Sequence, residues 1–114
     1  MSSLHTIEKL LFDALAAAKS IQEFSSNLDK ETFMTDELIQ SACERKFEII
    51  GEALNRLRKQ FPAIAADISE IDKIIGFRNI IAHGYDIVDS EMVWDTIQLC
   101  IPQLIEDLNN KISA

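Results

Sequence analysis

The chain has 114 residues, of which 47% are hydrophobic and 26% charged, and a formal net charge of −8. This length allows one hydrophobic core and is too short for two ordinary domains, so we expect a single domain over residues 1–114. Three glycines, two prolines and 7% aromatic residues are too few for the many turns of a β-sandwich or barrel, and they favour an all-α fold.

Other classes are excluded by the distribution of apolar and charged residues. No apolar run approaches the roughly 18 residues that a membrane span needs. The first twenty residues carry acids within their apolar pattern instead of a basic leader, so a cytoplasmic location is expected. The net charge argues against a general nucleic-acid coat protein. Residues 41–83 nevertheless carry a net charge of +1, between segments of −4 and −5.

The first half of the chain predicts two amphipathic helices. Over residues 4–28, apolar residues alternate at steps of three and four, as in a helix bundle, with one interruption at Ser25. A second stripe covers residues 39–61. It follows Asp36 and Glu37, which suit a helix start, and it stops before Pro62.

The second half predicts two more helices. After the connection PAIAAD, Ser69 and Asp72 have the spacing of a capping box, and the next helix is expected to end near Gly84. The last stripe starts after Asp89 and tolerates Pro102, with a kink expected there. Four helices with short links predict an antiparallel four-helix bundle with a short extra helical turn.

Arg78 interrupts the third stripe. Continuing that stripe by its own period places Arg78, Ala82 and Tyr85 after Ile75, so the arginine falls on the apolar line. An arginine is rarely buried without a partner, because removing water from an unpaired charge costs several kcal/mol. Arg78 is therefore expected to meet an acid such as Glu52, a subunit interface or an anionic ligand.

A second, polar stripe lies on the same predicted helix. His83 stands one turn beyond Asn79 and two turns beyond Gly76. A glycine inside a helix costs about 1 kcal/mol relative to alanine, and the missing side chain leaves room for another chain or a ligand to approach Asn79 and His83. Considered alone, His83 is interpreted as a residue that caps the helix end, and Arg78 as one member of an ion pair. Together, these groups can bind or act on a phosphate.

Metal and disulfide chemistry have little support in the sequence. Cys43 and Cys100 lie far apart, without a CxxC motif or a nearby histidine, so both are expected to be core residues. His5 falls in the first predicted helical turn, where a surface position is expected. We therefore expect neither a metal site nor a resident cofactor.

At this point the chain resembles a known family, the HepT-type toxins of HEPN/MNT toxin–antitoxin pairs in the HEPN superfamily. The family signature R-x4-H-x-Y is met by Arg78, His83 and Tyr85. EIIGEALNRL at residues 48–57 resembles the Ile-Gly-Glu-Ala helix of that family, and VWDTIQLCIPQL at residues 93–104 resembles its final helix. The PAIAAD connection departs from the family pattern Pro-Glu-Ile-Pro-Trp.

The resemblance implies a HEPN fold and a homodimer in which two R-x4-H motifs face each other across a cleft. It also implies metal-independent ribonuclease activity, with transfer RNA as the substrate class of relatives. The implied partner is a minimal nucleotidyltransferase antitoxin, which uses ATP to transfer AMP to the motif tyrosine, here Tyr85. That modification adds bulk and negative charge where RNA phosphates must dock.

Site roles follow from this resemblance and from the chemistry of RNA cleavage. His83 is assigned as general acid and base, since imidazole titrates in the right range. Arg78 is assigned as phosphate clamp and stabiliser of the transition state, and Asn79 as an orienting hydrogen-bonder. Glu52 is expected beside them, holding Arg78 or tuning His83, or else to be a surface acid.

Two other functions compete with the ribonuclease. The chain is alternatively a non-catalytic helical partner that presents Tyr85 or a nucleotide to a nucleotidyltransferase, a reading that the overall acidity favours. As a third possibility, the segment RNIIAH is merely the capped end of a helix in an ordinary bundle.

Overall fold

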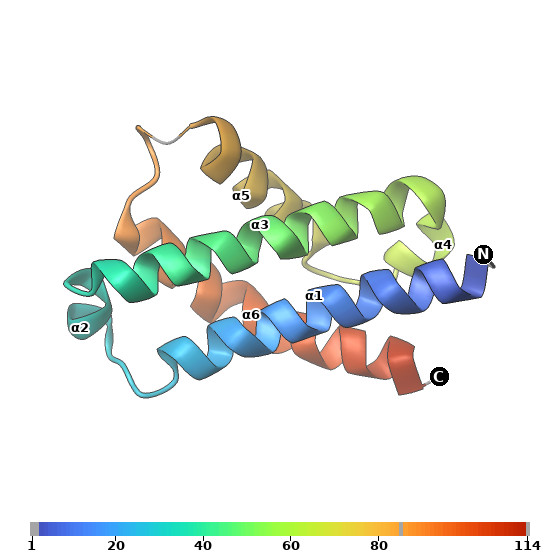
Figure 1. Cartoon of the computed structure of the whole chain (residues 1–114), viewed down its shortest axis with the longest axis horizontal. Helices are drawn as coiled ribbons and strands as arrows, with labels where there is room; N and C mark the ends of the chain where they lie inside the picture. Colours follow the sequence, from blue (N-terminus) through green and yellow to red (C-terminus); the bar gives the residue numbers. More distant parts are fainter. Residues whose placement is uncertain (1–2, 85, 114) are drawn as a thin grey trace.

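The computed structural model describes residues 3–84 and 86–113, and this part of the chain is helical without strands (Figure 1). Its helices are α1 (Ser3–Ser25), α2 (Lys30–Met34), α3 (Glu37–Gln60), α4 (Pro62–Ala65), α5 (Ile71–His83) and α6 (Ser90–Ser113). The four long helices alternate in direction, which confirms the predicted antiparallel four-helix arrangement. One extra helical turn was predicted without a position, and the described chain has two short helices, α2 and α4.

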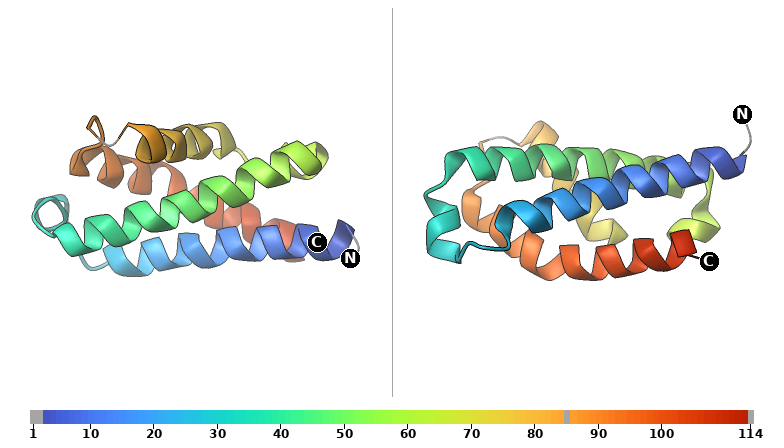
Figure 2. Two further views of the ribbon diagram at one scale, coloured as in Figure 1. Left: turned by 45° about the horizontal axis from the view of Figure 1, so that its top comes forward. Right: turned by 60° about the horizontal axis from the view of Figure 1, so that its bottom comes forward.

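The helix α3 lies in the middle of the arrangement. It packs against α1 on one side and α5 on the other, whereas α6 packs mainly against α1. Figure 2 shows α1 and α5 on opposite sides of α3. Because α5 contacts α6 at few positions, much of its surface is left uncovered by the rest of the described chain. None of the described helices has the length and apolar content needed to cross a membrane.

The core is built from one apolar face of each long helix, joined by Phe33 of α2 and by Ile68 of the connection between α4 and α5. Its largest fully buried side chains are Ile21, Phe33, Phe47, Ile50, Leu54, Leu57, Ile68, Ile74, Val93, Ile101, Leu104 and Leu108. Phe47 of α3 meets Phe77 of α5 edge to face, with 5.0 Å between ring centroids, a favoured aromatic geometry. Cys43 and Cys100 are buried free thiols, as predicted.

The start of α3 and the end of α5 agree with the sequence prediction. The Asp36 side chain accepts a hydrogen bond from the backbone N–H of Ile39 at 3.1 Å, which caps α3. The Gly84 N–H donates to the Ile80 carbonyl at 2.7 Å, and α5 ends at His83. Pro102 lies inside α6, which continues past it.

The first helix is shorter than predicted. The stripe was expected to run to Leu28, but α1 ends at Ser25. Ser25 is buried, and its hydroxyl donates to the Ile21 carbonyl at 2.8 Å. A serine in this role offers the backbone an alternative to continued helix. Leu28 still packs against the core, from the connection that leads to α2.

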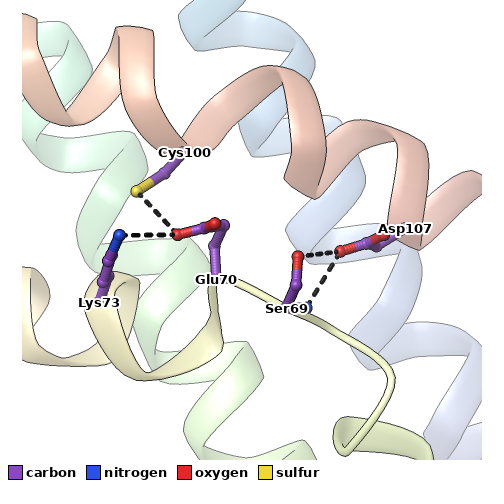
Figure 3. Close-up of polar contacts among 5 residues, drawn as sticks. All are labelled: Ser69, Glu70, Lys73, Cys100 and Asp107. Carbon is purple, nitrogen blue, oxygen red and sulfur yellow. Dashed lines mark hydrogen bonds and ion pairs between the residues drawn. The ribbon is translucent and has the colours of Figure 1, made fainter.

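The predicted capping box at the start of α5 is wrong. Ser69 does not cap α5, because its backbone N–H and its hydroxyl both donate to Asp107 of α6, at 3.1 and 3.0 Å (Figure 3). Asp72 forms an ion pair with Arg58 of α3 instead. The residue at the N-cap is Glu70. Contacts to α6 and α3 thus replace the local cap that the spacing suggested.

The predicted apolar line of α5 is also wrong beyond Ile75. The buried residues of α5 are Ile71, Ile74, Ile75, Phe77 and Ile81. Ala82 is exposed, and Arg78 is half-buried at the edge of this face. Ile74 and Ile81, which are two turns apart, lie along the middle of the buried face. The face has this position because α5 packs chiefly on one neighbour, α3.

The connection between α4 and α5 is fastened to α6 at several points. Besides the Ser69–Asp107 bonds, Asp67 pairs with Lys111. The Glu70 carboxylate lies 3.8 Å from the Cys100 sulfur and 3.6 Å from Lys73 Nζ (Figure 3). These contacts fix where α5 begins.

The stability that Asp107 contributes to this connection depends on pH. Burial raises its pKa, but hydrogen bonds from Gln103 and from Ser69 outweigh burial and hold the pKa below its usual 3.8. A carboxylate with a lowered folded-state pKa contributes stability that is present above the unfolded value and lost as pH falls through the folded value. The contribution of Asp107 is therefore present above about pH 4 and lost below it.

We expect Asp107→Asn to lower the free energy of unfolding at pH 6 by about 1 kcal/mol, since the bonds to a partly exposed carboxylate are screened by solvent. The deficit relative to wild type should shrink at pH 3. Urea unfolding at both pH values measures it, with Glu106→Gln, an exposed neighbour on α6, as control. An equal deficit at both pH values would contradict the assignment.

Candidate functional site

The side-chain stem of Arg78 on α5 packs directly against the α3 backbone at Gly51. A Cβ atom placed on Gly51 would lie 2.3 Å from the Arg78 Cβ and 2.5 Å from its Cγ. Such separations are far inside van der Waals contact, so α3 and α5 approach each other here as closely as a glycine allows. The aliphatic stem of the arginine is therefore enclosed between the two helices.

The charged end of Arg78 is only partly satisfied within the chain. Its Nη1 donates to the Asn79 side-chain oxygen at 3.2 Å. Its Nε is buried and has no hydrogen-bond partner among the described residues. None of the ion pairs formed by residues 3–84 and 86–113 involves Arg78. A buried donor without a partner costs about 1–3 kcal/mol, so this arginine is held in place at an energetic cost.

Asn79 and His83 lie on the uncovered side of α5. Both side chains are exposed, and His83 is the last residue of the helix. A Cβ atom at Gly76 would meet nothing within 4 Å, so the open space expected there is present. His83 is roughly 140° around the helix axis from Arg78. The two side chains are thus presented in different directions from one helix.

Glu52 is not joined to this cluster. Glu52 is exposed on α3 and lines a groove of about 190 Å³ between α1 and α3, together with Asp13 and Arg56. That groove is on the α1 side of α3, whereas Gly51 faces α5. Tyr85 lies outside the described residues. Within the described chain, no three His, Cys, Asp or Glu side chains are grouped in a way that suits a metal ion.

The contact at Gly51 and the carboxylates beside it on α3 were not predicted from the sequence. Glu44, Glu48 and Gly51 occur at steps of four and three, which places them on one stripe of the helix. Burial, followed by the charge of Glu48, raises the pKa of Glu44 above its usual 4.5. Glu48 also lies 3.5 Å from Arg45 in an exposed ion pair. Carboxylates therefore border the place where Arg78 crosses α3.

A signal for the Gly51 contact was present in the sequence. A glycine inside a strongly amphipathic helix loses about 1 kcal/mol relative to alanine, so a close approach by another element can account for its presence. From the sequence, a close approach was expected at Gly76 and not at Gly51. It is Gly51 that touches a neighbouring helix, while Gly76 faces open space.

The helices that carry this cluster match a known protein family. The sequence model of the ribonuclease HepT-like family matches residues 14–110, which include α3, α5 and nearly all of α6. The chain belongs to the ribonuclease HepT-like family. The matched segment contains Gly51, Arg78, Asn79 and His83. The resemblance to HEPN proteins drawn from the R-x4-H-x-Y signature is thereby confirmed at the level of the family.

Individual relatives cover almost the whole chain. A Methanocaldococcus jannaschii protein named as a candidate RNase is 28% identical over 110 residues, which cover 93% of this chain and 96% of the relative. A second M. jannaschii protein with the same kind of name is 30% identical over 116 residues, covering 92% and 96%. A Thermococcus cleftensis protein named as a probable ribonuclease HepT is 32% identical over 94 residues, covering 82% and 84%. None of the solved structures gives a significant match.

The open space at Gly76 leads to a prediction for stability. In the single chain, we expect Gly76→Ala to raise the free energy of unfolding by about 1 kcal/mol, because alanine is the better helix former and its methyl group meets nothing within 4 Å. The reverse change at the exposed Ala82 of the same helix, Ala82→Gly, should lower it. Urea unfolding measures both. A loss of stability in Gly76→Ala would show that this face of α5 is covered in solution.

Proposed function

We propose that this chain is a metal-independent ribonuclease toxin that acts on RNA in the cytoplasm, with Arg78 and His83 as its catalytic pair. The observation that carries the proposal is the cluster on α5, where the guanidinium of Arg78 has a buried Nε without a partner and His83 stands exposed at the helix end. Membership of the ribonuclease HepT-like family supports the same chemistry.

The cleavage step uses the groups that α5 provides. His83 accepts the proton of a ribose 2′-hydroxyl, and the 2′-oxygen then attacks the adjacent phosphorus. The bond from phosphorus to the 5′-oxygen breaks, and an imidazolium returns a proton to that oxygen. The products are a 2′,3′-cyclic phosphate and a free 5′-hydroxyl. Arg78 offsets the extra negative charge of the phosphorane, and its bond to Asn79 orients the guanidinium.

The direction of the side chains supports a homodimer. Arg78 and His83 leave α5 roughly 140° apart, so one chain alone does not aim both at one phosphate. A two-fold axis that brings two uncovered faces of α5 together combines the arginine and histidine of both copies around a shared cleft. Each copy then supplies one imidazole, one acting as base and the other as acid.

Tyr85 is proposed as the control point. A nucleotidyltransferase antitoxin transfers AMP from ATP, as the tyrosine oxygen bonds to the α-phosphorus and pyrophosphate leaves. The new phosphate stands two residues beyond His83 in sequence, where it repels and blocks RNA phosphates. Transfer RNA is the proposed substrate class.

A second candidate function is favoured by charge. The chain carries a net charge of −8, and Glu44, Glu48 and Glu52 follow one another along α3 on both sides of Gly51. RNA is repelled by such a surface except where Arg78 emerges. In this alternative the chain cuts nothing and serves as a helical partner that presents Tyr85 to the transferase.

Cleavage of transfer RNA in EDTA separates the two functions. We expect wild-type protein to cut bulk transfer RNA with the metal chelated, and His83→Ala to be slower by a factor of about 10²–10⁴, as for loss of a general acid or base. His5→Ala, the same change at the other histidine in the first turn of α1, should cleave like wild type. RNA left intact by all three proteins would favour the binding partner.

The role of Tyr85 is tested by Tyr85→Phe, which lacks the oxygen that accepts AMP. We expect this variant to cleave RNA and to stay active after incubation with the cognate transferase and ATP. Wild type should gain the mass of one or more AMP groups and lose activity. A Tyr85→Phe protein that is modified and inhibited like wild type would place the modification elsewhere.

A further inference from the structure

We propose that Gly51 is the positioning residue for Arg78, and that the missing side chain at this point of α3 forms the seat that fixes the arginine along α5. For its catalytic consequence this inference rests on the ribonuclease function proposed above. The seat itself is a property of the two helices, and it can be tested without any RNA.

The contact is between the stem of the arginine and the backbone of α3. A methyl group on Gly51 would stand 2.3, 2.5 and 3.3 Å from the Cβ, Cγ and Cδ atoms of Arg78. The Cβ atom is bonded directly to the α5 backbone, so no rotation of the side chain moves it away. Any residue larger than glycine must therefore shift α5 relative to α3, which moves Arg78 out of the seam.

The seat also determines where the charge of Arg78 stands. With three carbons of its stem held against α3, the guanidinium has few remaining rotamers. Its Nε is enclosed without a partner, and Nη1 is turned toward Asn79 on the uncovered side of α5. An arginine that was free to move would place Nε in water, because an unpaired buried donor is unfavourable. The enclosed Nε therefore shows that packing on Gly51 overrides the preference of the side chain for solvent.

A second contact maintains the same register between the helices. Arg58 of α3 pairs with Asp72 of α5, seven residues after Gly51 on α3 and six residues before Arg78 on α5. These intervals are each about two helical turns, so both contacts fit one antiparallel alignment. Both pair members are partly exposed, and such a pair holds helices weakly. The close packing at Gly51 is the stricter of the two constraints.

Stability in two backgrounds gives the first test. In wild type, Gly51→Ala should lower the melting temperature, since the new methyl group collides with Arg78. In an Arg78→Gly background the three carbons are gone, and Gly51→Ala should raise the melting temperature, because alanine then replaces a helical glycine without obstruction. An equal drop in both backgrounds would overturn the seat.

A signal from Arg78 itself gives the second test and does not depend on the folding of Arg78→Gly. The Nε–H resonance of Arg78, identified in nitrogen–proton spectra by its loss in Arg78→Lys, should exchange slowly with water in wild type. It should exchange rapidly in Gly51→Ala. Ile21→Val, which loosens the core on α1 where Ile21 is fully buried, should lower the melting temperature and leave the resonance protected. Equal protection in Gly51→Ala and wild type would overturn the inference.

Activity then separates this inference from the proposed function. If Arg78 is the phosphate clamp, its displacement in Gly51→Ala should lower kcat/KM on transfer RNA by roughly 10²-fold, as small misplacements of catalytic groups do. Adding Gly51→Ala to Arg78→Gly, which lacks all three clashing carbons, should cause no further loss. Wild-type protein without cleavage, but with the expected resonance behaviour, would reject the ribonuclease and keep the seat. Full activity in Gly51→Ala would reject the positioning role of Gly51.

Discussion

The close approach of α3 and α5 at Gly51 is the constraint on which the site depends. Most helix pairs in the bundle are held by interlocking apolar side chains. At Gly51 the contact is between an arginine stem and a bare backbone, with no space left for a single extra carbon. The position of the charged residue is thereby tied to the packing of the fold.

This arrangement explains how a chain with a net charge of −8 keeps a cation ready for an anion. Arg78 is not paired with any carboxylate of the described chain, although Glu44 and Glu48 lie on the same stripe of α3 as Gly51. An ion pair would partly neutralise the guanidinium and compete with a phosphate. Holding the stem by packing leaves the charge available, at the cost of an enclosed Nε.

The class of fold and the location of the cluster were predictable from the sequence, because both depend on local patterns. Apolar spacing reveals long helices, and an arginine among isoleucines stands out as an exception. Apart from the early end of α1, the errors concern contacts between distant segments. Ser69 has a plausible local role as a cap, but it bonds to Asp107, 38 residues later in sequence. Likewise, the contact at Gly51 was missed because only the packing of α5 on α3 places the Arg78 stem against it.

The placement of α5 at the edge of the bundle has a consequence for its motions. Among the long helices it is the least packed, since α3 is its main support and α6 touches it at few positions. The unit formed by α1, α3 and α6 retains its own apolar contacts when α5 detaches. Local opening of α5 therefore requires less free energy than global unfolding. Under mild denaturation, backbone amides of α5 should therefore exchange with solvent before those of α1, and the cluster of Arg78, Asn79 and His83 should disperse while the remaining bundle is still folded.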